Sequence, residues 1–531
     1  MSQANFCQAI LANATRHPER LALRLTDPVS GQISEASYAS LLSQAASWQQ
    51  CLQRRGLVMG DRVLLASKVS IELYALLLAL LGLGLVPVLL DRGMSRGRLL
   101  AAMRASKAQA VVGEHALIKR WYLLPSLWRM QRLCIDGAGF GLTDLRRDYQ
   151  PASLAAFRCV ALPSADSHGL ISFTSGSTGA PKGADRTHHS LIAQHEAIRA
   201  HWPDQDSDID APCFPVLVLH NLSCGIRTVL PAIDLGAPGK ADGAQVLAQF
   251  AQAGVTRIAA APAFMQRLIS AAQANGQTLP QVRSLVVGGS TVSRELLEAC
   301  AAVFPNAHGR VVYGSTEAEP IAEIDMPELL AQWGQHSGYL VGRPVAQAQV
   351  VLVKPGSALT SETQVHAAQV APGATGEILV AGAHVLKRYV DNPAACAENK
   401  IPRADGLVWH RTGDCGFIDE QGQLWLTGRV KDAISTVAGE LFTYPLEMQI
   451  DALQGVVRSA LIQPSQQSPV LVLQGLPHNW AALQHILAQW PLPMLRWCQV
   501  ESMPVDGRHN SKIDRPALRE SLPQLTLQVL P

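Results

Sequence analysis

Residues 174–183 carry the densest group of side chains suited to binding phosphate. Their glycines permit positive φ angles, so that backbone N–H groups can converge, while the hydroxyls add donors and Lys182 adds a positive charge. A Walker A loop would end in Gly-Lys-Ser/Thr, but here Lys182 precedes Gly183. The stretch therefore predicts a polyphosphate site of another kind, with a flexible surface loop as the alternative. The phosphate-binding candidates are Thr174, Ser175, Gly176, Ser177, Thr178, Gly179 and Lys182.

Two further polar segments follow short apolar runs that are typical of buried strands. Gly288–Ser290 follows such a run, and the segment from Tyr313 to Glu317 follows another. Open α/β sheets bind ligands at the carboxyl ends of their strands, so we expect both segments to reach the same ligand. Tyr313 could stack on a base, Thr316 could hold a phosphate oxygen, and Glu317 offers the hard oxygen ligand that Mg²⁺ prefers.

Asp414 and Arg429 form a third candidate group. A carboxylate such as Asp414 can accept hydrogen bonds from both hydroxyls of a ribose, and Arg429 can meet ribose or phosphate. Taken alone, Asp414 is more typical of an ordinary turn aspartate. Its spacing from the pair Gly428-Arg429 favours the binding role.

The composition excludes some classes of function. The chain has 531 residues, and 44 Lys and Arg against 42 Asp and Glu leave a formal charge of +2, so no basic excess indicates nucleic acid. The ten cysteines include no C-x-x-C pair, so neither a disulfide framework nor a zinc site is indicated, and we expect the reducing cytoplasm. No apolar signal core precedes the early charges Arg16, Glu19 and Arg20.

One apolar run is long enough to require a test for a membrane span. Residues 73–90 contain no charged side chain, but Gly82, Gly84 and Pro87 interrupt them. We therefore predict a buried helix over about 71–81, a turn, and a buried strand over 86–89.

Helical patterns alternate with short apolar strands along most of the chain, which predicts a doubly wound α/β fold. We expect a large N-terminal domain built from such α/β subdomains and a small β subdomain, followed by a small α+β C-terminal domain. Residues 212–219 are interpreted as a strand, and with His220 they could line a substrate pocket. As a lone residue, His220 is equally typical of a structural histidine.

These motifs together resemble the acyl-adenylate-forming superfamily, which includes acyl-CoA synthetases, peptide-synthetase adenylation domains and luciferases. The resemblance covers nearly the whole chain and implies an adenylation core at residues 1–430 and a mobile domain at 431–531. It implies ATP and Mg²⁺ as cofactors, with Glu317 and Thr178 as metal ligands and Lys512, Lys182 and Glu317 as catalytic residues. The implied ATP and AMP contacts beyond residues 174–182 are Gly288, Tyr313, Gly314, Ser315, Thr316, Asp414 and Arg429.

Within that superfamily, three segments resemble the β-lactone synthetases of bacterial long-chain olefin synthesis. They are residues 214–217, 310–318 and 505–513. The resemblance implies activation of a fatty or β-hydroxy fatty acid, whose own hydroxyl then displaces AMP. Val218 and His220 depart from the bulkier apolar groups expected there, and residues 428–432 are closer to the acyl-CoA synthetase hinge. The expected acyl pocket comprises Phe214, Val218, His220, Gly289 and Ser290.

Three hypotheses for the function therefore stay open. The first, slightly favoured, is intramolecular β-lactone formation. The second is transfer to coenzyme A or a carrier thiol. The third is a non-catalytic nucleotide-binding homologue. The expected partner is a small carboxylic acid. Peripheral attachment to a membrane or a multienzyme complex stays open, as does the oligomeric state.

Overall fold

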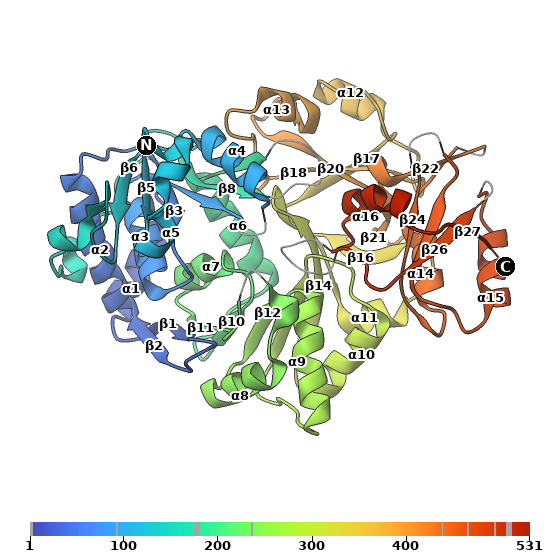
Figure 1. The fold of residues 1–531 in the computed structure, drawn as a ribbon, viewed down its shortest axis with the longest axis horizontal. Helices are drawn as coiled ribbons and strands as arrows, with labels where there is room; N and C mark the ends of the chain where they lie inside the picture. Colours follow the sequence, from blue (N-terminus) through green and yellow to red (C-terminus); the bar gives the residue numbers. More distant parts are fainter. Residues whose placement is uncertain are drawn as a thin grey trace.

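The computed structural model describes residues 4–91, 94–174, 181–234, 237–437, 439–464, 467–492, 495–505 and 512–530 (Figure 1). One sheet has the strand order β7-β6-β5-β3-β4-β8-β9, parallel except for the last pair. Its strands are β3 Arg62–Ala66, β4 Val86–Leu90, β5 Ala110–Gly113, β6 Gln131–Cys134, β7 Thr143–Asp144, β8 His168–Thr174 and β9 Lys182–Thr187. Its helices include α2 Tyr38–Arg54, α3 Ile71–Gly82, α4 Arg96–Ser106 and α6 His188–His201.

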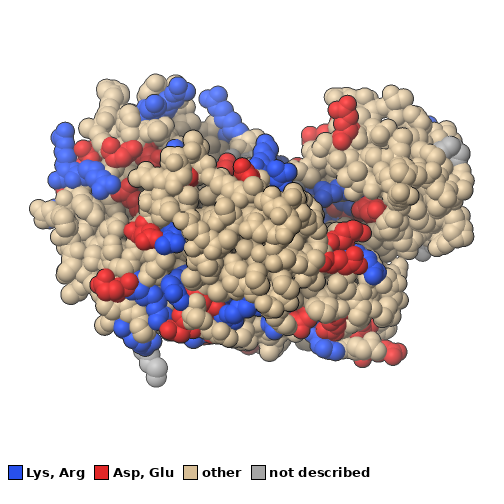
Figure 2. Space-filling view, turned by 90° about the horizontal axis from the view of Figure 1, so that it is seen from below, with Lys and Arg blue, Asp and Glu red and all other residues tan. Residues whose placement is uncertain are grey.

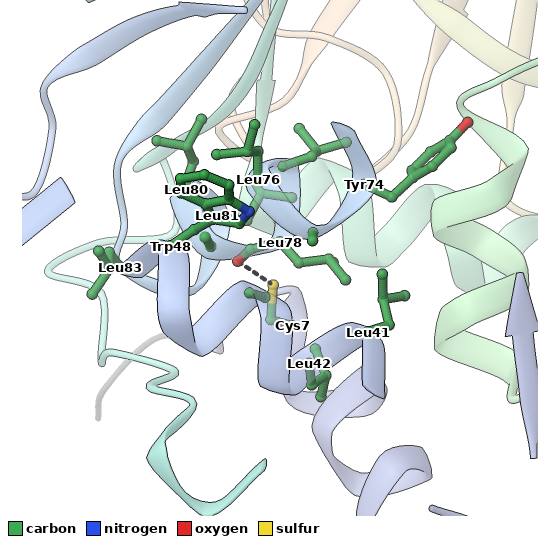
Figure 3. Close-up of a cluster of buried hydrophobic side chains, with 14 of the residues drawn as sticks. Cys7, Leu41, Leu42, Trp48, Tyr74, Leu76, Leu78, Leu80, Leu81 and Leu83 are labelled. Atoms are coloured by element: carbon green, nitrogen blue, oxygen red, sulfur yellow. Dashed lines mark hydrogen bonds between the residues drawn. The ribbon is translucent and has the colours of Figure 1, made fainter. Parts of the chain in front are cut away.

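Helix α3 and strand β4 confirm the prediction for the long apolar run. Ser70 caps α3 by accepting from the Leu73 N–H, and the helix is buried from Tyr74 to Gly82. It packs against α1 (Cys7–Arg16) and α2, as Figure 3 shows. Gly82 allows close approach to α2 and to residue 158, since a Cβ there would lie 2.6 Å from Gln49 Nε2 and 2.6 Å from the Arg158 carbonyl oxygen. Among the described residues, no helix combines the length and apolar character needed to cross a bilayer.

The second sheet runs in the order β17-β18-β20-β21-β16-β15-β14-β13-β12-β10-β11-β1-β2, with β19 beside β20. The strands from β14 to the β2 end of this sheet are β1 Leu21–Thr26, β2 Ile33–Ser37, β10 Ile209–Pro212, β11 Arg227–Leu230, β12 Arg257–Ala260, β13 Ser284–Gly288 and β14 His308–Ser315. The antiparallel remainder is β15 Ala318–Asp325, β16 Tyr339–Pro344, β17 Gln349–Val353, β18 Gly376–Ala381, β19 Lys400–Pro402, β20 Val408–Ile418 and β21 Leu424–Arg429. The associated helices are α7 Leu217–Cys224, α8 Gly243–Ala253, α9 Pro262–Ala274, α10 Arg294–Val303, α11 Met326–Ala331, α12 Glu362–Ala367 and α13 Pro393–Asn399.

The strand predicted over residues 212–219 is wrong. Strand β10 ends at Pro212, and helix α7 begins at Leu217. Val218, Leu219 and Leu222 recur with helical spacing, and Gly225 ends the helix at φ +80°. The apolar run was misread as a strand because short apolar runs do not separate buried helices from buried strands.

The C-terminal part has its own sheet, of order β24-β25-β26-β27, and its own hydrophobic clusters. Its elements are the short pair β22 Ile434–Thr436 and β23 Gly439–Leu441, then α14 Tyr444–Asp451, β24 Val456–Ile462, β25 Val470–Gly475, α15 Trp480–Ala488, β26 Arg496–Val500, α16 Arg515–Ser521 and β27 Gln528–Val529. A 3₁₀ turn, Val430–Asp432, joins it to β21. The division near residue 430 and the mobility of the second part stay predictions.

Charged side chains of both signs are interspersed over the face in Figure 2, with large uncharged areas between them. This agrees with the near-zero net charge of the chain. The face carries no extended field of one sign that would suit nucleic acid.

A buried ion pair ties the C-terminal part together. The Arg515 guanidinium contacts the Glu447 carboxylate directly, and its Nη1 donates to the Leu461 carbonyl oxygen at 3.1 Å. The other Glu447 oxygen accepts from the Leu461 N–H at 2.7 Å. Arg515 and Glu447 are each at least nine-tenths buried, so α14, β24 and α16 meet at one charged contact.

We predict that Arg515→Leu loosens this domain, because it leaves the Glu447 carboxylate buried without its partner. Such a loss typically costs about 3–5 kcal/mol. Hydrogen exchange in the peptides of β24 and β25 should accelerate accordingly. Arg519→Leu is the matched control. Arg519 lies on the same helix, but it is more exposed and its ion pair with Asp432 is longer, at 3.6 Å. Equal exchange in wild type and Arg515→Leu would contradict the prediction.

Candidate active site

The ends of the glycine-rich segment are held together by strand pairing. Thr174 ends β8 and Lys182 begins β9, and the two residues are antiparallel register partners. The chain therefore leaves and returns at the same edge of the sheet. Because β3, β4 and β8 run parallel, this edge is the one at their carboxyl ends, where open α/β sheets bind ligands.

Arg186 connects this hairpin to the second sheet. Its Nη1 donates to Ser172 Oγ at 2.6 Å, and its Nη2 donates to the Thr316 carbonyl oxygen at 3.0 Å. Thr316 and Glu317 form the turn between β14 and β15, since Ser315 and Ala318 are register partners. The glycine-rich segment and the Glu317 turn, some 140 residues apart in sequence, are thus brought to one place, as both predicted site groups require.

The Glu317 carboxylate is held by groups from the 386–410 region. Glu317 Oε1 accepts from the Tyr389 hydroxyl at 2.9 Å, and its backbone oxygen accepts from the Leu386 N–H at 2.8 Å. Tyr389 is itself placed by an isolated bridge to Ala184 of β9. Its hydroxyl stays protonated, because burial and the neighbouring Glu317 carboxylate raise the pKa of Tyr389.

Glu317 is ionised in this environment. Burial alone would raise the pKa of Glu317, but Lys400 and the Tyr389 hydrogen bond oppose burial, as does His410 when its imidazole is charged, and the pKa lies below its ordinary value. Burial also lowers the pKa of His410 to about 3, so its imidazole is neutral at pH 7. The positive charge facing Glu317 is therefore that of Lys400, whose pKa burial lowers to about 8.

Lys400 is fixed by its strand. It begins β19 and faces His410 of β20 in register, and its ammonium donates to the Leu386 carbonyl oxygen. Lys182 approaches the same centre, since the ammonium groups of Lys182 and Lys400 lie 5.3 and 5.4 Å from the Tyr389 ring centroid. Lys182 also pairs with the exposed Glu398 at 3.5 Å, a weak contact that solvent screens. Two lysines and one carboxylate thus surround Tyr389.

Tyr313, Asp414 and Arg429 form a second polar centre. The Tyr313 hydroxyl donates to Asp414 Oδ2 at 2.8 Å, and Arg429 Nε donates to Asp414 Oδ1 at 2.7 Å. Asp414 and Arg429 are register partners on β20 and β21, which explains why their spacing predicted a common role. Each Asp414 oxygen keeps a lone pair, so the carboxylate can still accept from the two hydroxyls of a ribose. The structure brings these three predicted site residues into contact, and their role in binding a nucleotide stays a prediction.

Two predicted site residues carry buried hydroxyls without a protein partner. Ser290 Oγ and Ser315 Oγ are buried, and neither has a hydrogen-bond partner among the described residues. Buried polar atoms are normally paired, so such orphans indicate a place where a ligand supplies the missing bonds. Together with the ionised Glu317, which offers hard oxygens, they fit a magnesium nucleotide.

Two glycines at the carboxyl end of β13 are required by the backbone itself. Gly288 has no room for a side chain, since a Cβ would lie 2.7 Å from the Val312 carbonyl oxygen. Gly289 adopts φ +92°, in the left-handed region that favours glycine. A larger residue at Gly289 would therefore strain the backbone whatever the shape of the pocket, so Ser290 is the better position for probing acyl contacts.

The other pocket candidates lie differently from what we expected. Val218 and His220 are on helix α7 and are buried, and Val218 belongs to the hydrophobic cluster of the N-terminal region. They do not stand at a strand end. Phe214, partly buried, precedes α7. Contact of these residues with an acyl chain stays a prediction.

His195, His220 and Cys224 form a cluster of potential metal ligands on α6 and α7. His195 Nδ1 lies 3.0 Å from His220 Nδ1, while Cys224 Sγ lies 3.7 Å from His220 Nε2. His195 and Cys224 thus contact opposite nitrogens of the His220 ring, and the lone pairs of these nitrogens point in different directions. Burial lowers the pKa of His195 to about 4 and that of His220 well below its usual range, so both are neutral. The arrangement is a buried hydrogen-bonded chain, which needs no metal.

Some predicted residues cannot be placed. Ser175, Gly176, Ser177, Thr178 and Gly179 lie outside the described residues, as does the side chain of Thr174. Lys512 is exposed and lies three residues before the buried Arg515. Its neighbour Ile513 forms an isolated β-bridge with Val505. Its catalytic role stays a prediction.

Sequence reasoning missed Tyr389, Lys400 and His410. None of them stands next to a glycine-rich turn, and Lys400 follows a short helix in an otherwise ordinary polar segment. One signal was present: Lys400 and His410 flank a hairpin, so strand pairing could have placed them together. Their nearness to Glu317 arises from tertiary packing.

The chain belongs to the AMP-binding enzyme family, whose model matches residues 10–390. It is 30% identical to an olefin beta-lactone synthetase of Xanthomonas campestris pv. campestris, over 97% of this chain and 96% of that protein. It is 31% identical to the protein of the same name from Stenotrophomonas maltophilia, over 91% and 90%. The O-succinylbenzoate coenzyme A synthetase of Bacillus subtilis, solved with ATP and a magnesium ion, has the same fold, with a TM-score of 0.75, 19% identity and coverage of 98% and 100%.

These findings confirm the predicted superfamily and α/β fold class, and they make the chain an acyl-adenylate-forming enzyme. The hypothesis of a non-catalytic homologue is thereby not supported. The ten cysteines are free thiols in the structure.

We predict that Lys400→Met moves the acid limb of the adenylation rate to higher pH. Without the Lys400 charge, burial raises the pKa of Glu317 with less opposition, and a protonated Glu317 cannot bind Mg²⁺. Losing an interaction with a charged group costs about 1.5–3 kcal/mol, so the Mg²⁺ concentration for half-maximal rate should rise roughly tenfold at the acid end. It should not rise at pH 8, where the carboxylate is ionised in both proteins.

Lys387→Met is the matched control. It removes a positive charge from the same segment, but Lys387 pairs with Asp166 at the surface. Initial rates of pyrophosphate release between pH 5 and 9 measure both variants against wild type. An acid limb that is identical in Lys400→Met and wild type would refute the role given to Lys400.

Proposed function

We propose that this enzyme uses MgATP to activate a β-hydroxy fatty acid and then closes the acyl-adenylate to a β-lactone. The observation that carries the activation step is the ionised Glu317, which is bound by the Tyr389 hydroxyl and faces Lys400. Lys182, at the start of β9, lies on the same Tyr389 ring. The lactone step is supported by the two relatives named olefin beta-lactone synthetases, which align over nearly the whole chain.

In this proposal, each polar centre binds one part of the nucleotide. The Tyr313 ring stacks on the base while its hydroxyl stays bound to Asp414, and Asp414 accepts from the ribose hydroxyls. Glu317, with Thr178, would hold Mg²⁺, which would offset charge on the phosphates. The glycine-rich segment and Lys182 hold the phosphates, and the Ser315 hydroxyl supplies a further hydrogen bond.

The first step joins two anions, so its main barrier is electrostatic. The substrate carboxylate attacks the α-phosphorus of ATP, and pyrophosphate leaves. Lys182 and Lys512 neutralise charge on the reacting groups, and the bound geometry aligns them. Lys400 sits behind Glu317 and keeps the metal ligand ionised without contacting substrate.

The second step consumes the mixed anhydride. The β-hydroxyl oxygen attacks the acyl carbon, the bond from that carbon to the bridging oxygen breaks, and AMP leaves while the hydroxyl proton passes to solvent. The product is a four-membered lactone. The nearest alternative, attack by coenzyme A or a carrier thiol, is favoured by the hinge segment 428–432, which resembles that of acyl-CoA synthetases.

The ten free thiols are compatible with the expected reducing cytoplasm, which stays part of this proposal.

The acceptor is tested by incubating the enzyme with MgATP and matched plain and β-hydroxy acids, with and without coenzyme A. We predict AMP, pyrophosphate and a product lighter than the β-hydroxy acid by one water, all without any thiol. The plain acid is the control, since it can form the adenylate but cannot cyclise. AMP that accumulates only when coenzyme A is added would replace the lactone hypothesis with the thiol ligase.

The role of Lys512 is tested by separating the two steps. We predict that Lys512→Ala slows adenylation by roughly 10²–10³, the typical effect of one preorganised electrostatic contact. The variant should consume a chemically prepared acyl-adenylate at nearly the wild-type rate, because in this family the lysine leaves the site before the second step. Arg496→Ala, an exposed position at the start of β26 in the same part of the chain, is the control. Equal losses in both steps would contradict the assignment.

A further inference from the structure

Five large apolar side chains are exposed within one short region near the N-terminal sheet. Their exposed fractions are 46% for Leu117, 52% for Tyr122, 54% for Leu123, 58% for Trp128 and 85% for Phe140. Single exposed apolar residues need no explanation, but a contiguous group usually marks an interaction site. We call these five residues the 117–140 surface.

The 117–140 surface is contiguous and firmly supported. Its residues lie on or beside the short helical turns α5 (His115–Ile118), η1 (Trp121–Leu123) and η2 (Pro125–Leu127). The Trp121 ring stacks on Phe140 with centroids 6.3 Å apart and lies 6.4 Å from Tyr122. Trp121 Nε1 donates to the Phe140 carbonyl oxygen at 2.8 Å, and Trp128 Nε1 donates to that of Tyr122 at 3.2 Å. The apolar groups are therefore held outward by a built framework.

Within residues 115–131, the charged side chains of this surface are all basic. Lys119, Arg120 and Arg129 are exposed among the apolar residues, and residues 115–131 contain no Asp or Glu. Across the described residues, no carboxylate pairs with any of these three side chains. The acid just beyond, Asp136, accepts from the His115 N–H at 2.6 Å. A partner for this surface must be apolar and anionic together.

We propose that the 117–140 surface docks the enzyme on an anionic lipid bilayer. Trp and Tyr rings with polar tips suit the interface between headgroups and acyl chains, and Leu and Phe suit its apolar side. Basic side chains attract anionic headgroups. A protein partner would need a complementary acidic and apolar patch, whereas an anionic bilayer offers both chemistries everywhere on its surface.

The position of the 117–140 surface relates this docking to the proposed reaction. Residues 114–118 follow the carboxyl end of β5, and residues 135–140 follow that of β6. Strands β4, β5, β6 and β8 are parallel, so the surface lies along the same sheet edge from which β8 leads into the glycine-rich segment. An enzyme docked there would meet an apolar acid at the bilayer surface. The docking itself does not depend on the proposed reaction.

Co-sedimentation with vesicles tests the proposal directly. The full chain should bind vesicles of equal parts phosphatidylglycerol and phosphatidylcholine at about 0.05 M salt, and bind far less at about 0.5 M salt or to pure phosphatidylcholine. Each basic residue near an anionic surface contributes roughly fivefold, so Lys119→Glu with Arg129→Glu should weaken binding by roughly 25-fold or more. Trp128→Ala with Phe140→Ala should weaken it roughly tenfold or more.

Matched controls lie on other surfaces. Lys240→Glu with Lys354→Glu makes the same charge change, and Val29→Ala with Val457→Ala removes exposed apolar groups elsewhere. These pairs should bind vesicles like wild type. Adenylation of a short, water-soluble acid without vesicles should be unchanged in every variant, which shows that the fold and the active site are intact.

Three results would overturn the proposal. One is the absence of binding to anionic vesicles. A second is equal binding by wild type and the 117–140 variants. The third is a dimer in sedimentation velocity that Trp128→Ala with Phe140→Ala converts to monomer, without any vesicle binding by the wild-type protein, since the surface would then be an interface between copies of this chain.

Discussion

The candidate site depends on one constraint: the Glu317 carboxylate must stay ionised while it is largely removed from water. Burial works against the charge of Glu317, and the Lys400 ammonium and the Tyr389 hydroxyl reverse that effect. Lys400 in turn is held by the Leu386 carbonyl oxygen and by its register opposite His410. A carboxylate of the kind that Mg²⁺ prefers is thus kept ionised by the protein itself. The cost of its burial is offset by a network that spans β9, the 386–389 segment and β19.

That network also explains why the fold needs both large sheets. The first sheet delivers the glycine-rich segment between Thr174 and Lys182, and the second delivers the Glu317 turn and the Asp414–Arg429 pair. Arg186 joins them through the Thr316 carbonyl oxygen. Since strand ends are rigid relative to loops, the groups that would hold base, ribose, phosphate and metal are fixed by backbone pairing, and the side chains need little reorganisation on binding.

Motifs at strand ends were predictable from sequence because their function and their local structure leave the same signature. Gly288, Tyr313 and Glu317 follow apolar runs, and Asp414 is found through its spacing from Arg429. The helix α3 was predictable because glycines and Pro87 interrupt its apolar run. In contrast, α7 was taken for a strand, since a short apolar run has no decisive period. Lys400 and Tyr389 were missed because their role exists only through contacts between distant segments.

The central claim, attack of a substrate carboxylate on the α-phosphorus, is tested most directly by isotope transfer. A β-hydroxy acid labelled with ¹⁸O in both carboxyl oxygens is turned over with unlabelled MgATP, and the products are weighed by mass spectrometry. The account predicts one ¹⁸O in AMP, one in the lactone and none in pyrophosphate, because the bridging oxygen of the adenylate leaves with AMP. Unlabelled AMP, or ¹⁸O in inorganic phosphate with ADP as the other product, would contradict it.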